Sequence, residues 1–111
     1  MRKLILPAIL VLLALSTIDC SKDDLPLFRI RNDRATKANL QVKTSGGNTI
    51  NINDVAAGQT TGFQEAAQGQ IEATATIQNE SVSPTVTFNA TNNNSYTIVV
   101  TTANPPTLRV E

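Results

Sequence analysis

After residue 24, apolar and polar side chains alternate one by one along most of the chain. The alternation is longest over residues 70–78, where every second residue is Ile or Ala and the residues between them are Gln, Glu or Thr. Successive side chains of a strand point to opposite faces, so such a segment has one face for a core and one for water. An amphipathic helix needs a spacing of about 3.6 residues, and no segment of useful length after residue 24 has it. The chain is therefore predicted to be all-β.

Shorter segments with the same alternation are separated by residues that favour turns. Gly46 and Gly47 can adopt positive φ without steric strain, and the asparagines at 92–94 tolerate it, so both places predict tight turns. Seven or eight short strands, enough for two packed layers, are expected over residues 25–111. They are placed at 28–31, 40–43, 50–53, a short segment around Phe63, 70–78, 86–89, 96–100 and 108–110.

The core of these layers is expected to combine rows of Ile, Leu and Val with the few aromatic side chains of the chain. Phe28, Phe63, Phe88 and Tyr96 are predicted to face inward. Val99 lies on the opposite face of its strand from its apolar neighbours at 98 and 100. That strand is therefore expected either to be covered on both faces or to expose one apolar residue.

The first residues have the organisation of a signal peptide. Arg2 and Lys3 form a positive start, and an apolar run follows from 4 to 18. A transmembrane helix needs about 20 apolar residues, so this run is short for a membrane span. Export from the cytoplasm is the prediction.

The segment S-T-I-D-C-S-K-D-D at 16–24 resembles the start of lipoproteins from the Bacteroidota. The resemblance implies that Cys20 becomes the first mature residue and carries acyl chains. Residues 1–19 are then the signal peptide, 20–24 a lipidated tether and 25–111 the β-domain. Because one acyl chain binds a membrane only marginally, stable anchoring needs the several chains that such lipoproteins carry.

The same resemblance implies that Lys22, Asp23 and Asp24 act as a signal for display at the cell surface. The residue before the lipidation site is Asp19, where such lipoproteins normally have a small residue. Ordinary cleavage after Ser16 is therefore the alternative, since Ala14 and Ser16 supply the small residues that this cleavage needs. That route would release a soluble periplasmic or secreted protein.

Residues 28–100 resemble the bacterial extracytoplasmic family named domain of unknown function 4397. The resemblance rests on four short segments, which are R-I-R-N at 29–32, L-Q-V-K at 40–43, V-A-A-G-Q-T-T-G-F at 55–63 and S-Y-T-I-V-V at 95–100. It implies an immunoglobulin-like antiparallel β-sandwich located outside the cytoplasm. The matching residues are turn and core positions, so the resemblance implies no activity.

Residues suited to catalysis or metal binding are scarce. The chain has no His and one Cys, so it lacks an imidazole and cannot form an intramolecular disulfide. The candidate carboxylates fall on turns or outward strand positions, and the segment N-I-N-D at 51–54 is better explained as a polar strand face than as a calcium site. No catalytic residue, metal site or cofactor is therefore predicted. Enzymatic activity is only a residual alternative for the function of this chain. The carboxylates considered are Asp54, Glu65, Glu72 and Glu80.

Two groups of surface residues are candidate binding sites. A basic group could hold an acidic ligand or glycan, although a solvated basic strand edge is the favoured explanation. Rows of Thr could pair with sugar hydroxyls, although ordinary β-propensity accounts for them better. The basic group is Arg29, Arg31, Arg34 and Lys37, and the Thr rows are Thr74 and Thr76 beside Thr85 and Thr87.

Charge argues against nucleic acid as a partner. Without the signal peptide the chain keeps seven basic and eight acidic residues, and nothing concentrates the basic ones as phosphate binding requires. The predicted function is a non-catalytic binding or structural module, anchored by lipid to the outer membrane and displayed at the cell surface, with an envelope glycan or protein as partner. The alternative is a soluble secreted inhibitor or structural subunit.

Overall fold

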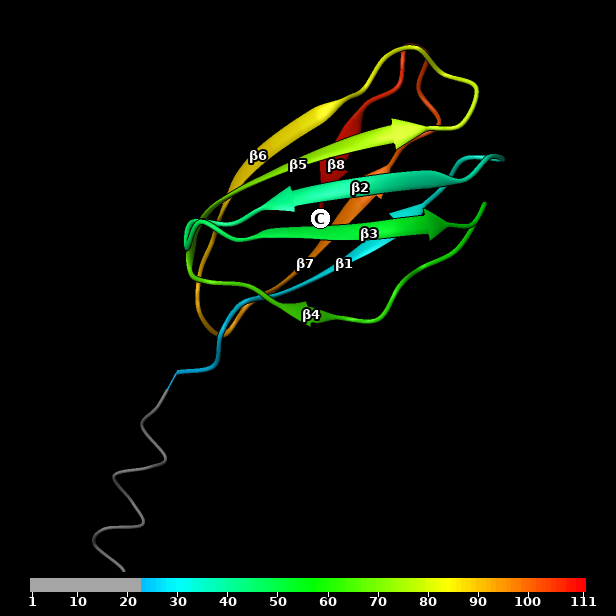
Figure 1. Ribbon diagram of the computed structural model, residues 1–111. Coiled ribbons are helices and arrows are strands. Elements are labelled where there is room, and N and C mark those ends of the chain that lie inside the picture. Colours follow the sequence, from blue (N-terminus) through cyan, green and yellow to red (C-terminus); the bar gives the residue numbers. More distant parts are fainter. Residues whose placement is uncertain (1–22) are drawn as a thin grey trace, which may run out of the picture.

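The computed structural model describes residues 23–111, and its regular structure is made of strands alone (Figure 1). Within those residues no helix is long and apolar enough to cross a membrane. The eight strands are β1 (Leu27–Asn32), β2 (Ala38–Lys43), β3 (Thr49–Val55), β4 (Gln64–Glu65), β5 (Gly69–Ile77), β6 (Thr85–Ala90), β7 (Ser95–Val100) and β8 (Leu108–Val110).

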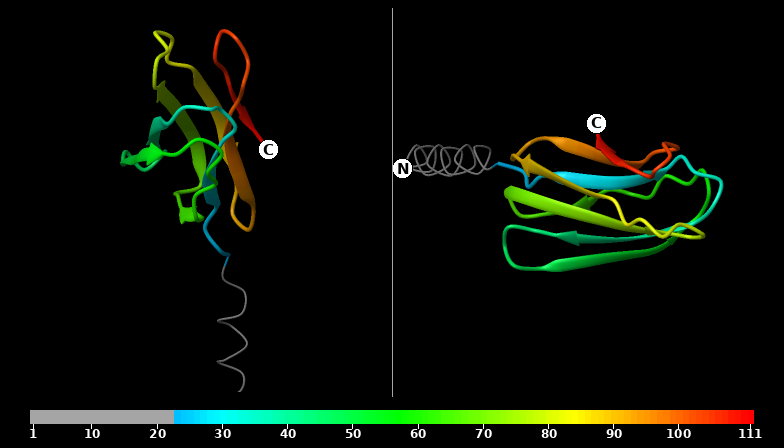
Figure 2. Two further views of the ribbon diagram at one scale, coloured as in Figure 1. Left: turned by 90° about the vertical axis from the view of Figure 1, so that its right-hand side faces the viewer. Right: turned by 90° about the horizontal axis from the view of Figure 1, so that it is seen from above.

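The strands form two four-stranded sheets that pack face to face, and the predicted all-β sandwich is confirmed. Sheet A has the order β4-β1-β7-β8, and sheet B has the order β3-β2-β5-β6. Figure 2 shows the two layers in the view from above. The prediction of antiparallel pairing holds for every neighbouring pair except one, because β1 and β7 run parallel over their full length.

The parallel pair follows from the chain's route between the layers. β1 and the hairpin β7–β8 belong to sheet A, while the hairpins β2–β3 and β5–β6 belong to sheet B. Parallel neighbours need a long connection, and here β2 to β6 provide it. The chain enters sheet A with β1, which pairs with β4 on one side and with β7 on the other.

The tight turn predicted after Lys43 joins β2 to β3. The N–H of Thr44 donates to the carbonyl of Asn48, and the N–H of Gly47 donates to the carbonyl of Thr44. Gly47 has φ of 85°, a value that glycine adopts without the steric strain of a side chain. Gly47 therefore allows the tight turn of this hairpin.

The core lies between the sheets and consists of the inward rows expected from the alternation. Ile71, Ala73, Ala75 and Ile77 of β5 are at most 2% exposed. The small side chains of the two alanines leave room for bulky residues from the facing sheet. Fully buried residues from sheet A are Phe28, Ile30, Ile98 and Val100.

One aromatic residue does not join this core. Phe63 is 46% exposed and precedes the strand expected around it, because β4 covers only Gln64–Glu65. The prediction that Phe63 faces inward is therefore wrong. Its ring instead lies under the guanidinium group of Arg29, 4.7 Å from it, on the outer face of sheet A.

Val99 is fully buried although it points away from the core. In the register of sheet A it lies between Arg31 and Arg109. Both guanidinium groups bond to the carboxylate of Glu111, so the polar ends are held together above the strand. Of the two outcomes expected for this strand, coverage on both faces is correct.

Candidate functional site

The chain enters the sandwich at one end of the strands, called here the entry pole. The side chain of Asn93, in the β6–β7 loop, accepts a hydrogen bond from the N–H of Asp24 at 2.9 Å and donates one to the carboxylate of Asp23 at 3.3 Å. The N–H of Asn93 donates to the carbonyl of Asp24 at 2.8 Å. Contacts with the domain thus already begin within the segment predicted as a tether, whereas Cys20 and Lys22 lie outside the described residues.

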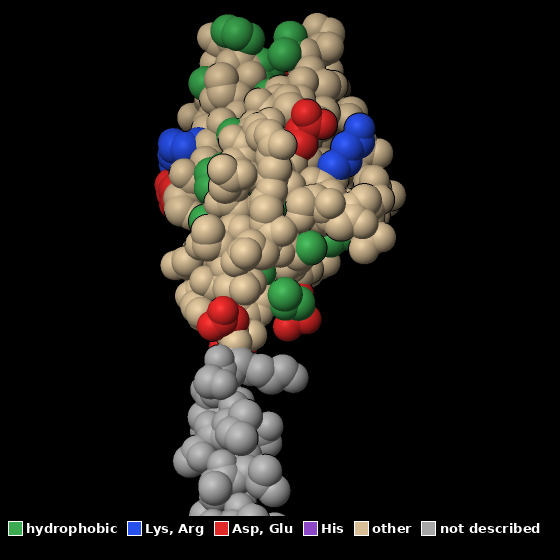
Figure 3. All heavy atoms as spheres, turned by 90° about the vertical axis from the view of Figure 1, so that its left-hand side faces the viewer, with side chains coloured by type: hydrophobic (Ala, Val, Ile, Leu, Met, Phe, Trp, Pro, Cys, Tyr) green, Lys and Arg blue, Asp and Glu red, His purple; other side chains and the backbone are tan. Residues whose placement is uncertain are grey.

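The surface of the entry pole is dominated by uncharged polar groups (Figure 3). The hydroxyl of Ser45 donates to the carbonyl of Gln68, and the side chain of Gln68 accepts from the N–H of Asn92. The hydroxyl and the N–H of Thr91 both form hydrogen bonds to the hydroxyl of Tyr96, and these two bonds lower the pKa of Tyr96. Loops from both sheets are tied together here by these hydrogen bonds.

Four loops gather at the opposite end, called here the distal pole. They connect β1 to β2, β3 to β4, β5 to β6 and β7 to β8. Loops carried by a rigid scaffold are frequent sites of binding, so this pole is the candidate functional site. Its two organising side chains are Asn32 and Arg34.

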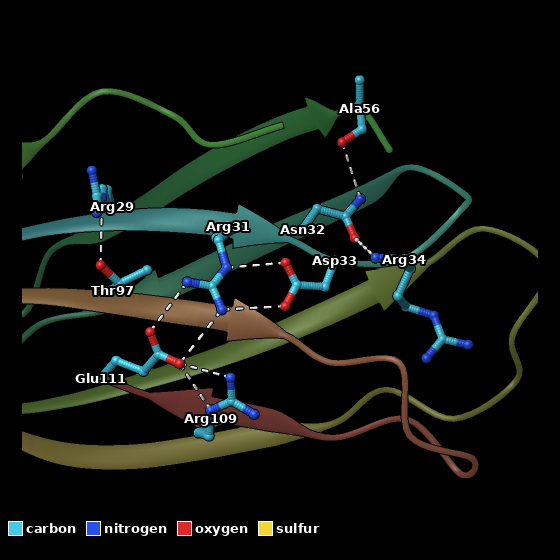
Figure 4. Close-up of polar contacts among 9 residues, drawn as sticks. All are labelled: Arg29, Arg31, Asn32, Asp33, Arg34, Ala56, Thr97, Arg109 and Glu111. Carbon is cyan, nitrogen blue, oxygen red and sulfur yellow. Dashed lines mark hydrogen bonds and ion pairs between the residues drawn. The ribbon is translucent and has the colours of Figure 1, made fainter. Parts of the chain in front are cut away.

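Asn32 is fully buried at the end of β1 and ties two of these loops together (Figure 4). Its amide nitrogen donates to the carbonyls of Thr36, Val55 and Ala56 at 2.8, 3.1 and 3.3 Å. Its side-chain oxygen accepts from the N–H of Arg34 at 3.0 Å. Both ends of the amide are used, which is what a buried polar group requires.

Asn32 was not predicted from the sequence as a functional residue, although a signal for it is present. Phe28 and Ile30 alternate into the core, and the same parity places Asn32 on the inward row. A polar residue at an inward position has to find hydrogen-bond partners within the protein. The inward position of Asn32 in the alternation, together with its polar side chain, would therefore have predicted that it holds the loops together.

Arg34 holds the other two distal loops. Its guanidinium group donates to the carbonyls of Thr101 and Ala103 at 2.8 and 3.1 Å and pairs with the carboxylate of Glu80 at 2.9 Å. The Arg34 side chain is 13% exposed, so this pair is better shielded from water than the other ion pairs in residues 23–111. The charge of Arg34 is consequently committed to the protein itself.

A hollow of about 290 Å³ opens beside the Arg34–Glu80 pair. Because the ion pair forms one wall, the hollow offers amide, hydroxyl and main-chain groups rather than an unpaired charge. It contains neither a nucleophile next to a base nor two facing carboxylates, and its groups suit hydrogen bonding to a neutral polar ligand. It is lined by Arg34, Ala35, Thr36, Gln78, Asn79, Glu80 and Thr102.

The four basic residues considered as a group do not form one site. Arg29 donates to the hydroxyl of Thr97 at 3.0 Å, Arg31 pairs with Asp33 at 3.0 Å, and Lys37 lies 3.6 Å from Asp54. The explanation as a solvated strand edge is also wrong for β1, which has a hydrogen-bonded neighbour on each side. These charges brace the outer face of sheet A and the distal loops.

Glu111 joins Arg31 of β1 to Arg109 of β8 (Figure 4). Its carboxylate accepts from Arg109 at 2.7 Å and from Arg31 at 3.2 Å. Hydrogen bonds from Arg109, and then from Arg31, lower the pKa of Glu111. Hydrogen bonds to Asp33 and Glu111 raise the pKa of Arg31.

The candidate carboxylates are dispersed over the domain. Asp54 has φ of 59° and sits in a β-bulge where β3 has one residue more than β2, Glu72 points outward beside Lys43, and Glu65 ends β4. Within residues 23–111, no three His, Cys, Asp or Glu side chains are grouped as a metal ion would need. The structure thus brings none of Asp54, Glu65, Glu72 and Glu80 together with another.

The rows of Thr lie on the outer face of sheet B as predicted from the alternation. Thr74 and Thr85 are opposite each other in the register, and their hydroxyl groups are 3.0 Å apart. Thr76 and Thr87 are exposed on the same face. The face is polar, and the hydroxyl groups of Thr74 and Thr85 are bonded to each other across the two strands.

Comparison with known proteins gives a likeness of fold alone. No family model matches the chain, and no curated protein matches it. A solved structure, described as the NMR structure of the protein from Eubacterium rectale, superposes with a TM-score of 0.59 at 15% identity and covers 78% of this chain and 88% of its own. At that level of identity the likeness shows that the two proteins share a β-sandwich fold.

Proposed function

We propose that this protein is a lipid-anchored module of the bacterial cell envelope that binds a partner with its distal loops and catalyses no reaction. The observation that carries the proposal is the position of the entry pole relative to the distal pole. Asp24 is fastened to the domain by Asn93, and only four peptide units separate Asp24 from Cys20. A chain of that length spans at most about 14 Å, so a lipid on Cys20 would hold the entry pole close to the membrane.

The distal loops would then be the part of the domain that is able to extend furthest from the membrane. The hollow beside Arg34 supports a binding role, because it offers several polar groups on a braced frame. The charges of Arg34 and Glu80 in its lining are paired with each other, which favours an envelope glycan, or a polar protein segment, over an acidic ligand. The absence of a base next to a nucleophile in this hollow supports a non-catalytic role.

Display at the cell surface is part of the proposal. The side chains of Asp23 and Asp24 are exposed in the folded domain, so an export machinery could contact them. Only the main chain of Asp24 and one carboxylate oxygen of Asp23 are engaged by Asn93. Replacement of both by Ala is expected to leave the protein lipidated but retained on the periplasmic side of the outer membrane.

The decisive experiment measures the mass of the mature N-terminus and labelling with radioactive palmitate. An acylated Cys20 is expected in the wild type, and the Cys20→Ala variant should lose both the label and membrane retention. A mature protein that starts at Thr17 and stays in the soluble fraction would overturn lipid anchoring and favour the soluble alternative. A Cys20→Ala variant that still fractionates with membranes as the wild type does would also overturn anchoring by a lipid on Cys20, without favouring the soluble alternative.

The binding role is tested separately with purified peptidoglycan and with a neutral glycan array. A double variant, Gln78→Ala with Thr102→Ala, removes two lining side chains of the hollow and should weaken binding. Thr49→Ala at the entry pole is the matched control and should bind as the wild type does. Equal binding by all three proteins would exclude the distal hollow as the site.

A further inference from the structure

The sandwich has four edge strands, and they differ in how well they are protected. An exposed edge carries unpaired N–H and C=O groups, which proteins shield with short strands, charges or bulges. β4 has two residues, and β8 has three with Arg109 among them. β3 pairs regularly only as far as Ile52 before the bulge that contains Asp54.

β6 has none of these protections. Its six residues, T-V-T-F-N-A, pair with β5 in unbroken register and contain neither charge nor proline. The N–H of Ala75 donates to the carbonyl of Pro84, which makes this a hydrogen-bonded pair. Pairs of the two kinds alternate along an antiparallel ladder, so the N–H and C=O groups of Thr85, Thr87 and Asn89 point away from β5, to the open edge.

The same side of the sandwich has an incompletely covered apolar layer. Val86 and Phe88 of β6 are half-buried, and so are Leu108 and Val110 of β8. These two strands are close to each other across the layers and form the edges of their sheets. A strand added beside β6 would satisfy the free main-chain groups and would cover part of this apolar surface.

We propose that the occupant of this edge is a second copy of the chain, joined by antiparallel pairing of the two β6 strands. A two-fold axis at Thr87 places Thr87 opposite its own copy and Thr85 opposite Asn89. All three positions have their main-chain groups directed to the edge, so each opposed pair exchanges two hydrogen bonds. The result is a continuous eight-stranded sheet built from the two B sheets.

The absence of charged residues in β6 favours self-association over pairing with a charged segment. In this two-fold contact a charged residue on the axis would meet its own copy, and Thr87, which occupies the axis, is uncharged like the rest of β6. Thr and Asn side chains opposite one another can form hydrogen bonds on the outer face. Antiparallel pairing turns the entry poles of the two copies to opposite ends of the shared sheet, so copies anchored in one membrane would pair with their strands lying along it. The contact itself involves neither the entry pole nor the residues before Asp23.

Disulfide trapping tests the register. The full chain carrying Cys20→Ala has no other thiol, so Thr87→Cys in that background introduces a single one. Opposed residues of a hydrogen-bonded pair have Cα atoms about 5.5 Å apart, a distance that a disulfide spans. Mild oxidation should give a covalent dimer for Thr87→Cys and none for the matched controls Thr49→Cys on β3 and Thr76→Cys on the central strand β5.

Sedimentation equilibrium of the Cys20→Ala chain tests the association itself. Thr87→Pro removes an N–H that β5 does not use, so it should leave the fold intact by circular dichroism while raising the dimer dissociation constant about tenfold or more. Thr87→Lys, which places two like charges at the two-fold axis, should do the same and covers the case in which the proline variant fails to fold. Three results would each overturn the proposal. The Cys20→Ala chain could stay monomeric at all concentrations, or its association could be unaffected by Thr87→Lys. Cross-linking at Thr49 or Thr76 could also equal the cross-linking at Thr87.

Discussion

Asn32→Asp changes one buried side-chain group without changing its size, and its consequence can be worked out from the distances. The introduced carboxyl cannot donate to the carbonyls of Thr36, Val55 and Ala56 when ionised, but it can still accept from the N–H of Arg34. Three lost hydrogen bonds cost about 3 kcal/mol, and an uncompensated buried charge brings the total to about 4 kcal/mol near neutral pH.

The loss should depend on pH in a defined direction. Burial and the surrounding carbonyl oxygens raise the pKa of the introduced carboxyl above its unfolded value of about 3.9. Stability is then greatest below that unfolded pKa and falls as the pH rises through the folded pKa. A protonated carboxyl recovers one donation, so the loss should shrink to about 2 kcal/mol near pH 4.

The assay is urea or thermal unfolding followed by circular dichroism, with the wild type measured at each pH. For a domain of this size the expected loss near neutral pH lowers the Tm by about 16–32 °C. Asn51→Asp is the matched control, because Asn51 is exposed on β3, and it should change stability by less than about 0.5 kcal/mol. A loss at Asn32 that equals the control, or one that grows on acidification, would refute the role assigned to Asn32.

Two further changes test the outer face of sheet A. Glu111→Gln should reduce stability near neutral pH, and the difference from the wild type should vanish in acid. Because the pKa of Glu111 is lowered in the folded state, the stability that its carboxylate contributes is present above the unfolded pKa and is lost as the pH falls through the folded pKa. Urea titrations of both proteins from neutral to strongly acidic pH check this, and a constant difference would contradict it. Phe63→Ala should cost less than about 1 kcal/mol, since the ring is half exposed and its main contact is Arg29, whereas Phe28→Ala should cost about 3–5 kcal/mol. Similar losses for the two variants in chemical unfolding would show that burial has been wrongly assigned.

Most of the fold could be predicted because alternation is a local property. The eight strands lie close to where the alternation indicates them, and the inward rows of β1, β2, β5 and β7 form the core. Phe63 was misplaced because a single aromatic residue after a turn has no neighbours whose parity would fix its direction. Its cross-strand neighbour Arg29 decides its position, and that pairing joins residues 34 positions apart in the sequence.

The parallel pairing of β1 with β7 could not be predicted for a similar reason. Each strand has an apolar row on one face, and such rows are compatible with either direction of the neighbour. The choice depends on which strands share a sheet, and the order β4-β1-β7-β8 is a property of the whole chain. Val99 could be recognised as unusual from parity, but the arginines that cover it come from two different strands.

The distal site could not be predicted from the sequence, for a different reason. Arg34 and Glu80 are 46 positions apart, and the hydrogen bonds from Arg34 to Glu80 and to the carbonyls of Thr101 and Ala103 depend on loops with no regular pattern. Composition shows that the chain has no imidazole and cannot form an intramolecular disulfide. It could not indicate which of the many Asn and Thr residues hold the loops together.

The parallel neighbour of β1 also determines when the domain can become complete. Leu27 lies beside Ser95 in sheet A, so the first strand must wait for a partner that is made 68 residues later. A chain that emerges N-terminus first, from a ribosome or through a translocation pore, therefore cannot finish sheet A until nearly its whole length is out. Contacts so distant along the sequence slow folding, and sheet A stays incomplete for as long as the chain is being threaded.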